Sequence, residues 1–194
     1  MPRLPGVSDR DASLSAKFAY YFMKRHFKKL TGHENDAMLD PIRMYAYIPK
    51  LLSGYGKLEQ AAAKVHLLDL RHRALAELKA ATTARCEYCI DLGSRISRDW
   101  GLSDEELLAL PNYRTASCFS DVDRLVLDYA SAMSRTPVEV SDELFDALRK
   151  HFDVPQLVEL TAIVALENMR ARFNLALDIG SAGFSEGMVC AIPG

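Results

Sequence analysis

The sequence lacks the features of several specialised protein classes. No apolar run approaches the roughly 18 residues that a membrane-spanning helix requires, and residues 1–15 contain no apolar core of a signal peptide. We therefore expect a cytoplasmic protein with no membrane partner. The formal net charge is −2 and the pI is about 6.2, so no overall basic field is available to bind nucleic acid.

Cysteine and β-strand patterns are also scarce. The 194 residues include four cysteines, too few for the disulfide framework of a small secreted domain. No segment shows the sustained alternation of apolar and polar residues that is typical of a β-strand. What the chain does contain is 49% hydrophobic and 26% charged residues, a balance typical of a globular protein with a sizeable core.

Apolar residues recur at three- and four-residue steps almost throughout, which predicts an all-α fold. We expect a single helical domain over residues 1–194 that begins with an extended arm over about residues 1–12. The predicted helices cover about residues 14–30, 42–54 with interruptions at Pro49 and Gly54, 57–65, 70–84, 86–100, 104–110, 121–134, 142–152 and 155–179. Their N-caps are predicted at Ser13, Asp69, Ser103, Ser120 and Ser141.

The pair Cys86-Glu-Tyr-Cys89 is the motif with the clearest chemical meaning. Cys86 comes directly after one predicted helix and directly before the next, so it should lie in the first turn of that second helix. The helix dipole favours the thiolate there, whereas an unperturbed thiol with a pKa of about 8.5 is only a few per cent ionised at pH 7. At this spacing the two side chains share a helix face, roughly 60° apart, so the sulfurs can form a reversible disulfide.

Other uses of the two cysteines meet specific objections. A zinc site would need two more ligands, and no second CxxC or histidine pair at finger spacing follows. A c-type haem needs a histidine directly after Cys89, where Ile90 stands. Thioredoxin carries its CxxC on a βαβ unit, and no strand pattern exists here. A redox pair is therefore favoured over inert cysteines and over a metal site, and we expect no metal and no cofactor.

The helix that begins at the motif separates apolar and polar residues onto two faces. One face carries Cys89, Ile90, Gly93, Ile96 and Trp100, and the other carries Asp91, Arg95, Arg98 and Asp99. The sulfurs therefore begin a partly buried stripe, which predicts a small, screened pocket. Asp91 and Arg95 are four residues apart, a spacing that predicts a surface ion pair.

Several runs of the chain resemble a known family. The resemblance is carried by Leu75-Ala-Glu-Leu-Lys-Ala-Ala-Thr-Thr-Ala-Arg-Cys86-Glu-Tyr-Cys89-Ile-Asp-Leu-Gly-Ser and by Gly101-Leu-Ser-Asp-Glu-Glu, with Tyr129-Ala, Ser141-Asp-Glu-Leu-Phe, Val158-Glu-Leu-Thr and Arg172-Phe-Asn-Leu-Ala-Leu further on. Over about two thirds of its length the chain is similar to a longer subgroup of the carboxymuconolactone decarboxylase and alkylhydroperoxidase D-like superfamily. The resemblance implies an all-helical fold that oligomerises. It also implies a CxxC pair that reduces hydroperoxides and is re-reduced by a dithiol protein.

The chain departs from this resemblance at two positions of the implied proton relay. The peroxidase members have a histidine four residues after the second cysteine and a glutamate twelve residues before the first, where this chain has Gly93 and Ala74. Glu77 lies one helical turn from Ala74 and is the expected replacement as general base. The alternative is that Glu77 pairs with a surface lysine or arginine.

Three further residues complete the expected site. Tyr88, between the two cysteines, and Gly93 are expected to line the substrate pocket. His72 is either a second lining residue that replaces the missing histidine or a solvent-facing side chain. Cys118 and Cys190 are expected to be buried structural residues.

These observations favour a thiol-dependent oxidoreductase that reduces a hydroperoxide. The attacking thiol is Cys86 on the argument from helix position, whereas the resemblance implies the second and more enclosed cysteine, Cys89. One alternative is a helical oligomer whose CxxC is vestigial or redox-sensing, and a weaker one is a decarboxylase-like lyase. We also expect a homo-oligomer, either a dimer or the trimer or hexamer that the family implies, because separated apolar faces leave surface that one layer of helices cannot cover.

Overall fold

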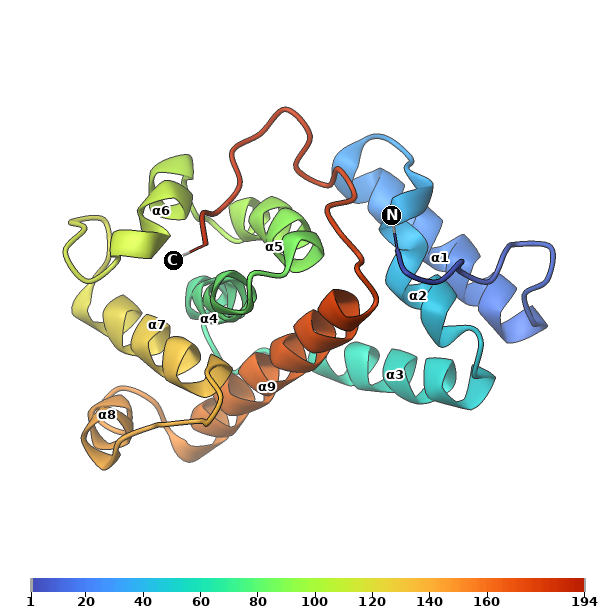
Figure 1. The fold of residues 1–194 in the computed structure, drawn as a ribbon. Helices are drawn as coiled ribbons and strands as arrows, with labels where there is room; N and C mark the ends of the chain where they lie inside the picture. The colour runs from blue at the N-terminus through green and yellow to red at the C-terminus, as the bar shows by residue number, and fades with distance from the viewer. Residues whose placement is uncertain (1, 194) are drawn as a thin grey trace.

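The computed structural model describes residues 2–193, and the regular structure in that range is helical (Figure 1). The helices are α1 (Leu14–Thr31), α2 (Asp40–Tyr45), α3 (Pro49–Ala62), α4 (Leu70–Ala84), α5 (Glu87–Asp99), α6 (Asp104–Ala109), α7 (Asp121–Ser134), α8 (Asp142–Leu148) and α9 (Val154–Ala176). Short 3₁₀ segments lie at Asp36–Leu39 and Leu110–Asn112. The predicted all-α class is confirmed.

Local signals explain where most helices begin and end. The side chain of Ser13 accepts a hydrogen bond from the backbone N–H of Ala16, and Ser103 and Ser120 each form a capping box with the acidic residue three positions on. Gly32 ends α1 with φ 82°, a left-handed conformation in which a Cβ is strained. These residues satisfy backbone groups that a helix end leaves without partners.

Four predicted boundaries are wrong. Pro49 begins α3 instead of interrupting it, because proline needs no N–H in the first turn of a helix. The same helix continues through Gly54, where an interior glycine costs only about 1 kcal/mol relative to alanine. Helices α8 and α9 each end about three or four residues before the predicted ends, at Leu148 and Ala176.

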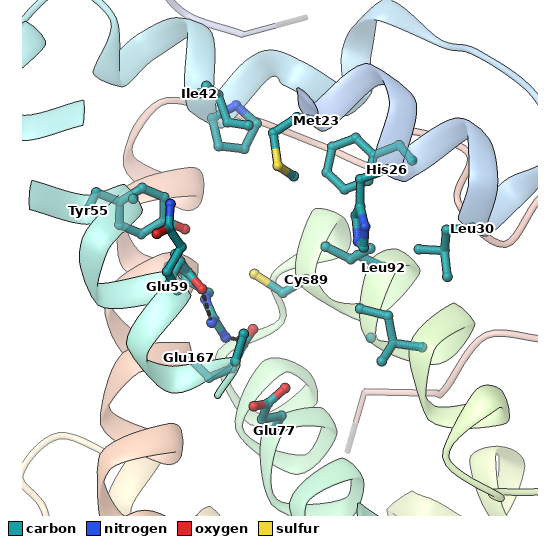
Figure 2. Close-up of a pocket in the computed structure, with 18 of the residues that line it drawn as sticks. Met23, His26, Leu30, Ile42, Tyr55, Glu59, Glu77, Cys89, Leu92 and Glu167 are labelled. Carbon is teal, nitrogen blue, oxygen red and sulfur yellow. Dashed lines mark hydrogen bonds and ion pairs between the residues drawn. The ribbon is translucent and has the colours of Figure 1, made fainter. Parts of the chain in front are cut away.

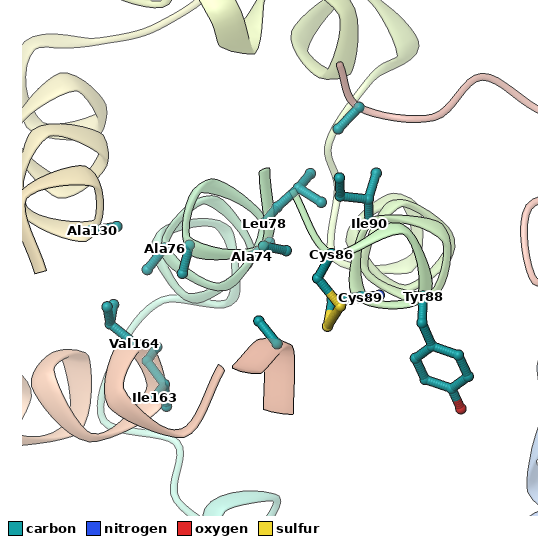
Figure 3. Close-up of a cluster of buried hydrophobic side chains, with 14 of the residues drawn as sticks. Ala74, Ala76, Leu78, Cys86, Tyr88, Cys89, Ile90, Ala130, Ile163 and Val164 are labelled. Carbon is teal, nitrogen blue, oxygen red and sulfur yellow. Dashed lines mark hydrogen bonds between the residues drawn. A yellow bond between two sulfur atoms is a disulfide. The ribbon is translucent and has the colours of Figure 1, made fainter. Parts of the chain in front are cut away.

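Helix α4 is the centre of the hydrophobic core and packs against α5, α7 and α9. Its buried face contains the small side chains of Ala74 and Ala76 beside the larger Leu78 (Figure 3). Alanine allows neighbouring helix backbones to approach closely, while leucine fills the spaces between them. This packing fixes the end of α4, where the cysteine motif begins.

Helices α1, α2 and α3 form a separate group on one side of α5 and α9 (Figure 1). The N-terminal arm lies against this group, since the hydroxyl of Tyr20 donates to the carbonyl of Val7 at 3.0 Å. On α1, Phe18 and Phe22 remain 65% and 63% exposed. Uncovered apolar side chains of this kind are the basis for expecting an oligomer.

Asp91 is not the surface residue that its spacing predicted. It is buried and accepts hydrogen bonds from the backbone N–H groups of residues 182–185 and from the hydroxyl of Ser181. Arg95 pairs instead with Asp99 at 2.8 Å. The C-terminal segment after α9 therefore crosses α5, and the carboxylate of Asp91 binds residues 181–185 of that segment (Figure 1).

Two other expectations concern burial. Cys118 and Cys190 are free thiols. Both were predicted to be buried, but in the structure both are only half-buried. Within residues 2–193, none of the helices has the length and apolar character needed to cross a membrane.

Candidate active site

The turn between α4 and α5 positions both cysteines. Arg85 adopts a left-handed conformation with φ 57° and ends α4, so the chain reverses within one residue. Cys86 then forms the N-cap of α5, and its sulfur accepts a hydrogen bond from the backbone N–H of Cys89 at 3.3 Å. The two sulfurs are bonded to each other, with their Cα atoms 5.2 Å apart (Figure 3).

The two sulfurs differ in their access to solvent. Cys86 is fully buried, whereas Cys89 is 6% exposed and lines a cavity. Cys86 is therefore the more enclosed of the pair, contrary to the expectation that the resemblance implied. The side-chain amide nitrogen of Asn174 on α9 lies 3.8 Å from the sulfur of Cys86 and 3.6 Å from that of Cys89. One amide donor thus faces both sulfurs.

The cavity has a volume of about 1460 Å³ and lies between α1, α2 and α3 on one side and α4, α5 and α9 on the other. Figure 2 shows the sulfur of Cys89 pointing into this space, between the acidic side chains of α3 and α9 and the apolar side chain of Leu92. The predicted small pocket is thus a large cavity. It forms because the α1–α3 group packs around the cysteine helix and does not cover it completely.

The polar end of the cavity is built around Arg170 of α9. Its Nε and Nη2 atoms donate to the two oxygens of Glu59 at 2.8 and 2.6 Å, and its Nη1 donates to Oε2 of Glu167 at 2.7 Å. Two carboxyl groups therefore share one guanidinium. Such charge-assisted bonds hold all three side chains in fixed positions.

The two carboxyl groups have different proton affinities. Complete burial raises the pKa of Glu167 to about 7; Arg170 opposes this shift, and the negative charge of Glu77 adds to it. Burial also acts on Glu59, but its two bonds to Arg170 outweigh that effect and keep its pKa below the ordinary value. Glu167 can thus gain and lose a proton near neutral pH, whereas Glu59 remains charged.

Glu77, the expected replacement base, lies in the same cavity. Oε1 of this residue accepts a hydrogen bond from Nε of Arg73 at 3.1 Å. Arg73 is itself buried and donates to the backbone carbonyls of Ala62 and Val65. Glu77 therefore pairs with an arginine inside the protein and not with a surface cation.

Gly93 and Tyr88 both line the cavity. A Cβ atom at Gly93 would lie 3.2 Å from Cδ1 of Leu78, so α4 packs closely beside this position. The hydroxyl of Tyr88 donates to the carbonyl of Met38 at 2.6 Å, and burial raises its pKa well above the ordinary value.

His72 does not lie among the cavity residues of the described chain, so its predicted place in the pocket is wrong. Its Nε2 atom is 3.6 Å from Oδ1 of Asp123 on α7, and its ring packs edge-on against Phe152. The physical reason is helical geometry, since five residues separate it from Glu77 and place the two side chains roughly 140° apart on α4.

Sequence reasoning missed the residues that other helices bring to the cysteines. These are Glu59 on α3, His26 on α1, and Glu167, Arg170 and Asn174 on α9. A signal was present for the last three, because they are polar residues that recur at three- and four-residue steps on one side of a long helix. A buried polar side chain needs a partner, so such residues mark a site more often than a surface.

Comparison with known proteins assigns the chain to a family. Residues 49–132, which contain Glu77 and both motif cysteines, match the model of the Carboxymuconolactone decarboxylase family. The chain is also 40% identical over 161 residues to the uncharacterised protein YnjA of Escherichia coli K12. The aligned region covers 80% of this chain and 84% of YnjA. The chain belongs to the carboxymuconolactone decarboxylase family. It carries a CxxC pair at Cys86 and Cys89.

Solved structures show the same fold at low sequence identity. An uncharacterised peroxidase-related protein from Ralstonia eutropha JMP134, described as an alkylhydroperoxidase AhpD core, superposes with a TM-score of 0.73 at 18% identity over 94% of both chains. The debrominase Bmp8 superposes with a TM-score of 0.70 at 22% identity over 89% of this chain and 90% of its own. A cysteine-to-alanine variant of Bmp8 in complex with 2,3,4-tribromopyrrole gives 0.71 at 20% identity, over 86% of this chain and 87% of its own.

Proposed function

We propose that this protein is a thiol-dependent oxidoreductase that reduces a hydroperoxide through Cys86 and Cys89 and is restored by a dithiol protein. One observation carries the proposal: the sulfur of Cys89 opens into a cavity, its bonded partner Cys86 is buried behind it, and the same cavity contains a carboxyl group with a pKa of about 7. A thiol, a resolving thiol and a proton carrier are the groups that peroxide reduction requires.

The first step takes place at Cys89, because its sulfur faces the cavity. The carboxylate of Glu167 accepts the thiol proton, and the thiolate attacks the O–O bond of the hydroperoxide ROOH. The peroxide bond breaks, the sulfur becomes a sulfenic acid, and the leaving alkoxide takes the proton from Glu167 to give the alcohol ROH. A carboxyl with a pKa near neutrality suits both transfers. Glu77, ion-paired to Arg73, supports Glu167 by raising its pKa.

The second step forms the disulfide. The sulfur of Cys86 attacks the sulfenic sulfur of Cys89, and water leaves. The sulfur of Cys86 is suited to the thiolate form. It accepts a hydrogen bond from the backbone N–H of Cys89 at the N-terminus of α5, and it lies near the side-chain amide of Asn174.

Reduction of the disulfide starts from the exposed side. A thiolate of the reductant attacks Cys89 from the cavity, and Cys86 leaves as a thiolate at the helix N-terminus. The second thiol of the reductant then attacks the mixed disulfide, which releases Cys89 and oxidises the reductant. The two electrons that the peroxide consumes thus come from the dithiol.

The test is hydroperoxide-dependent oxidation of a dithiol by the native protein and by two matched serine variants. Cys89→Ser should abolish turnover. Cys86→Ser should stop after one equivalent of peroxide and leave a sulfenic acid on Cys89, which dimedone traps for mass spectrometry. Turnover by Cys89→Ser, or a sulfenic acid on Cys86 in that variant, would reverse the assignment of the attacking thiol. Absence of any turnover in the native protein would favour a vestigial or redox-sensing pair.

A second candidate is reductive removal of a halogen from an aromatic compound. The volume of the cavity favours it, as does a neighbour with the same fold that is a debrominase crystallised with 2,3,4-tribromopyrrole. The reaction would replace bromide by hydrogen and consume the same two electrons from the Cys86–Cys89 pair. Release of bromide from a brominated pyrrole under the same assay, without peroxide turnover, would select this candidate.

A further inference from the structure

We infer that the cavity selects neutral organic hydroperoxides over hydroperoxides that carry a carboxylate. The inference rests on the proposed function for the reaction, but its basis is the shape and charge of the cavity. It names the substrate class and not the chemistry at the sulfurs.

An aromatic wall of three stacked rings forms one side of the cavity. The ring of Tyr45 lies between those of Tyr55 and Phe173, with centroid distances of 4.5 and 4.2 Å and interplanar angles of 15° and 5°. The three rings come from α2, α3 and α9, so they also hold the two groups of helices together. The two neighbouring rings cover both faces of Tyr45, and the remaining surface of the stack gives the cavity an apolar boundary for a hydrocarbon group.

The remaining walls are apolar over a volume larger than a small oxidant needs. At about 1460 Å³ the cavity exceeds the roughly 300–1,000 Å³ of common ligand pockets. The apolar side chains that line it include Phe18, Phe22, Met23, Ile42, Leu52, Leu92 and Ile96. Hydrogen peroxide would leave nearly all of this surface in contact with water. A bulky organic group would cover it and gain the hydrophobic contribution to binding.

The two arginines that line the described cavity are already paired with carboxylates, so they are not available to bind an anionic ligand. In the described part of the chain, the arginines that line it are Arg73 and Arg170, and both are bonded to carboxylates. Three carboxyl groups, Glu59, Glu77 and Glu167, face these two guanidinium groups. A ligand carboxylate would therefore enter a region whose cations are already neutralised, and it would lose hydration without gaining a partner.

The charges at the rim do not alter this balance. Lys57, Asp69 and Asp99 line the opening and are exposed to solvent, so the rim carries one lysine against two aspartates. His26 and His66 also line the cavity at exposed positions. Exposed charges of this kind are screened by water and salt.

The two halves of the cavity fix how a substrate would lie. Its hydroperoxide group meets Cys89 and Glu167 at the polar end, and its apolar group lies along the aromatic wall. Figure 2 shows this juxtaposition, with Tyr55 and Glu59 on one side of Cys89 and Leu92 on the other.

The kinetic test compares substrates that differ in one property. The methyl ester of linoleic acid hydroperoxide should have a kcat/KM at least tenfold above that of the free acid, which carries a carboxylate where the ester carries a neutral methyl ester. Equal values for the acid and the ester would overturn the inference.

A binding test separates the inference from the proposed reaction. It uses the double variant Cys86→Ser/Cys89→Ser, which cannot turn over, and calorimetry with 2-phenyl-2-propanol and with 2-phenylpropanoate. The neutral alcohol should bind at least tenfold more tightly than the anion of similar size. Selective binding by the double variant, with no turnover by the native protein, would refute the proposed reaction but support the preference for neutral ligands. Turnover by the native protein without selective binding would support the reaction and refute the preference.

A matched pair of tyrosine variants tests the aromatic wall. Tyr45→Ala removes the central ring of the stack and should weaken binding of 2-phenyl-2-propanol at least fivefold. Tyr47→Ala removes an exposed ring that does not line the cavity and should change binding less than twofold. Equal binding by both variants would overturn the role of the wall. If Tyr45→Ala fails to fold, the comparison of the alcohol with the anion still decides the inference.

Discussion

Nη1 of Arg170 donates a 2.7 Å hydrogen bond to Oε2 of Glu167, one turn back along α9. The same guanidinium also binds both oxygens of Glu59, so its single positive charge compensates two carboxyl groups. Burial then decides the outcome for Glu167, whose pKa rises to about 7 despite the arginine. Burial, which the shared arginine opposes only in part, is what makes Glu167 a proton carrier near neutral pH.

Glu167→Gln should lower peroxide turnover by about 10²-fold or more, the scale of general acid–base assistance. It should also remove the rise in kcat/KM through about pH 7 that a titrating carboxylate produces. Glu77→Gln is the matched control, since it removes a second cavity carboxyl. It should retain most turnover and move the pH profile to lower pH, because the charge of Glu77 raises the pKa of Glu167. The reverse result would identify Glu77 as the base.

The free energy of unfolding should fall as the pH rises from about 4.5 to about 7. In this window folded Glu167 holds a proton that the unfolded chain releases, because its pKa is raised from 4.5 to about 7. The expected loss is on the order of 3 kcal/mol. Urea unfolding of the native protein and of Glu167→Gln at several pH values measures this loss. The difference between the two proteins cancels the contribution of other titrating groups such as His72. Parallel curves for the two proteins would contradict the shift.

Asp91→Ala should destabilise the protein by about 3 kcal/mol or more, because it leaves several buried N–H groups of residues 182–185 without an acceptor. Protease cleavage within that segment should become faster. Asp99→Ala is the control: it breaks the partly exposed ion pair with Arg95 and should cost no more than about 1 kcal/mol. Equal protease resistance of the two variants would mean that the carboxylate does not hold the segment.

Gly93→His, combined with Glu167→Gln, should restore turnover by about tenfold or more, since it places an imidazole one helical turn beyond Cys89. The new Cβ would meet only the tip of Leu78, a flexible side chain that can shift. Gly93→Ala in the same background introduces that Cβ without the imidazole and should restore nothing. Equal rates for the histidine and alanine variants would show that the missing histidine is not what limits the reaction.

The protein should have the mass of an oligomer in light scattering at micromolar concentration, because large apolar side chains of α1 lie uncovered. Phe18→Glu should shift the mass toward the monomer if α1 forms the contact. A monomeric mass for the native protein would contradict the prediction.

Local sequence signals predicted the helices well. N-caps such as Ser13 and Ser120, and Gly32 at a helix end, act through neighbouring backbone groups that the sequence itself identifies. The disulfide pair was predictable for the same reason, as three residues separate its members. Gly54 shows the limit of such signals, because a glycine weakens a helix without stopping it when tertiary contacts hold both halves.

Long-range partners explain what the sequence could not predict. Asp91 has a suitable partner four residues away in Arg95, but its actual donors lie about ninety residues further along the chain. Glu167 acquires its raised pKa from burial, a property that depends on how α3, α4 and α9 pack. A spacing rule cannot predict the donors of Asp91 or the pKa of Glu167, because both depend on contacts between segments that are distant in the sequence.

The position of Trp100 has an optical consequence. It is the single tryptophan of the chain, it lines the cavity, and the guanidinium of Arg73 lies 5.5 Å from its ring centroid. Intrinsic tryptophan emission from this protein therefore originates entirely at the cavity wall, without background from other sites. A molecule that enters the cavity changes the polarity around that one indole. Ligand binding can therefore be followed by the intrinsic fluorescence of the unmodified protein.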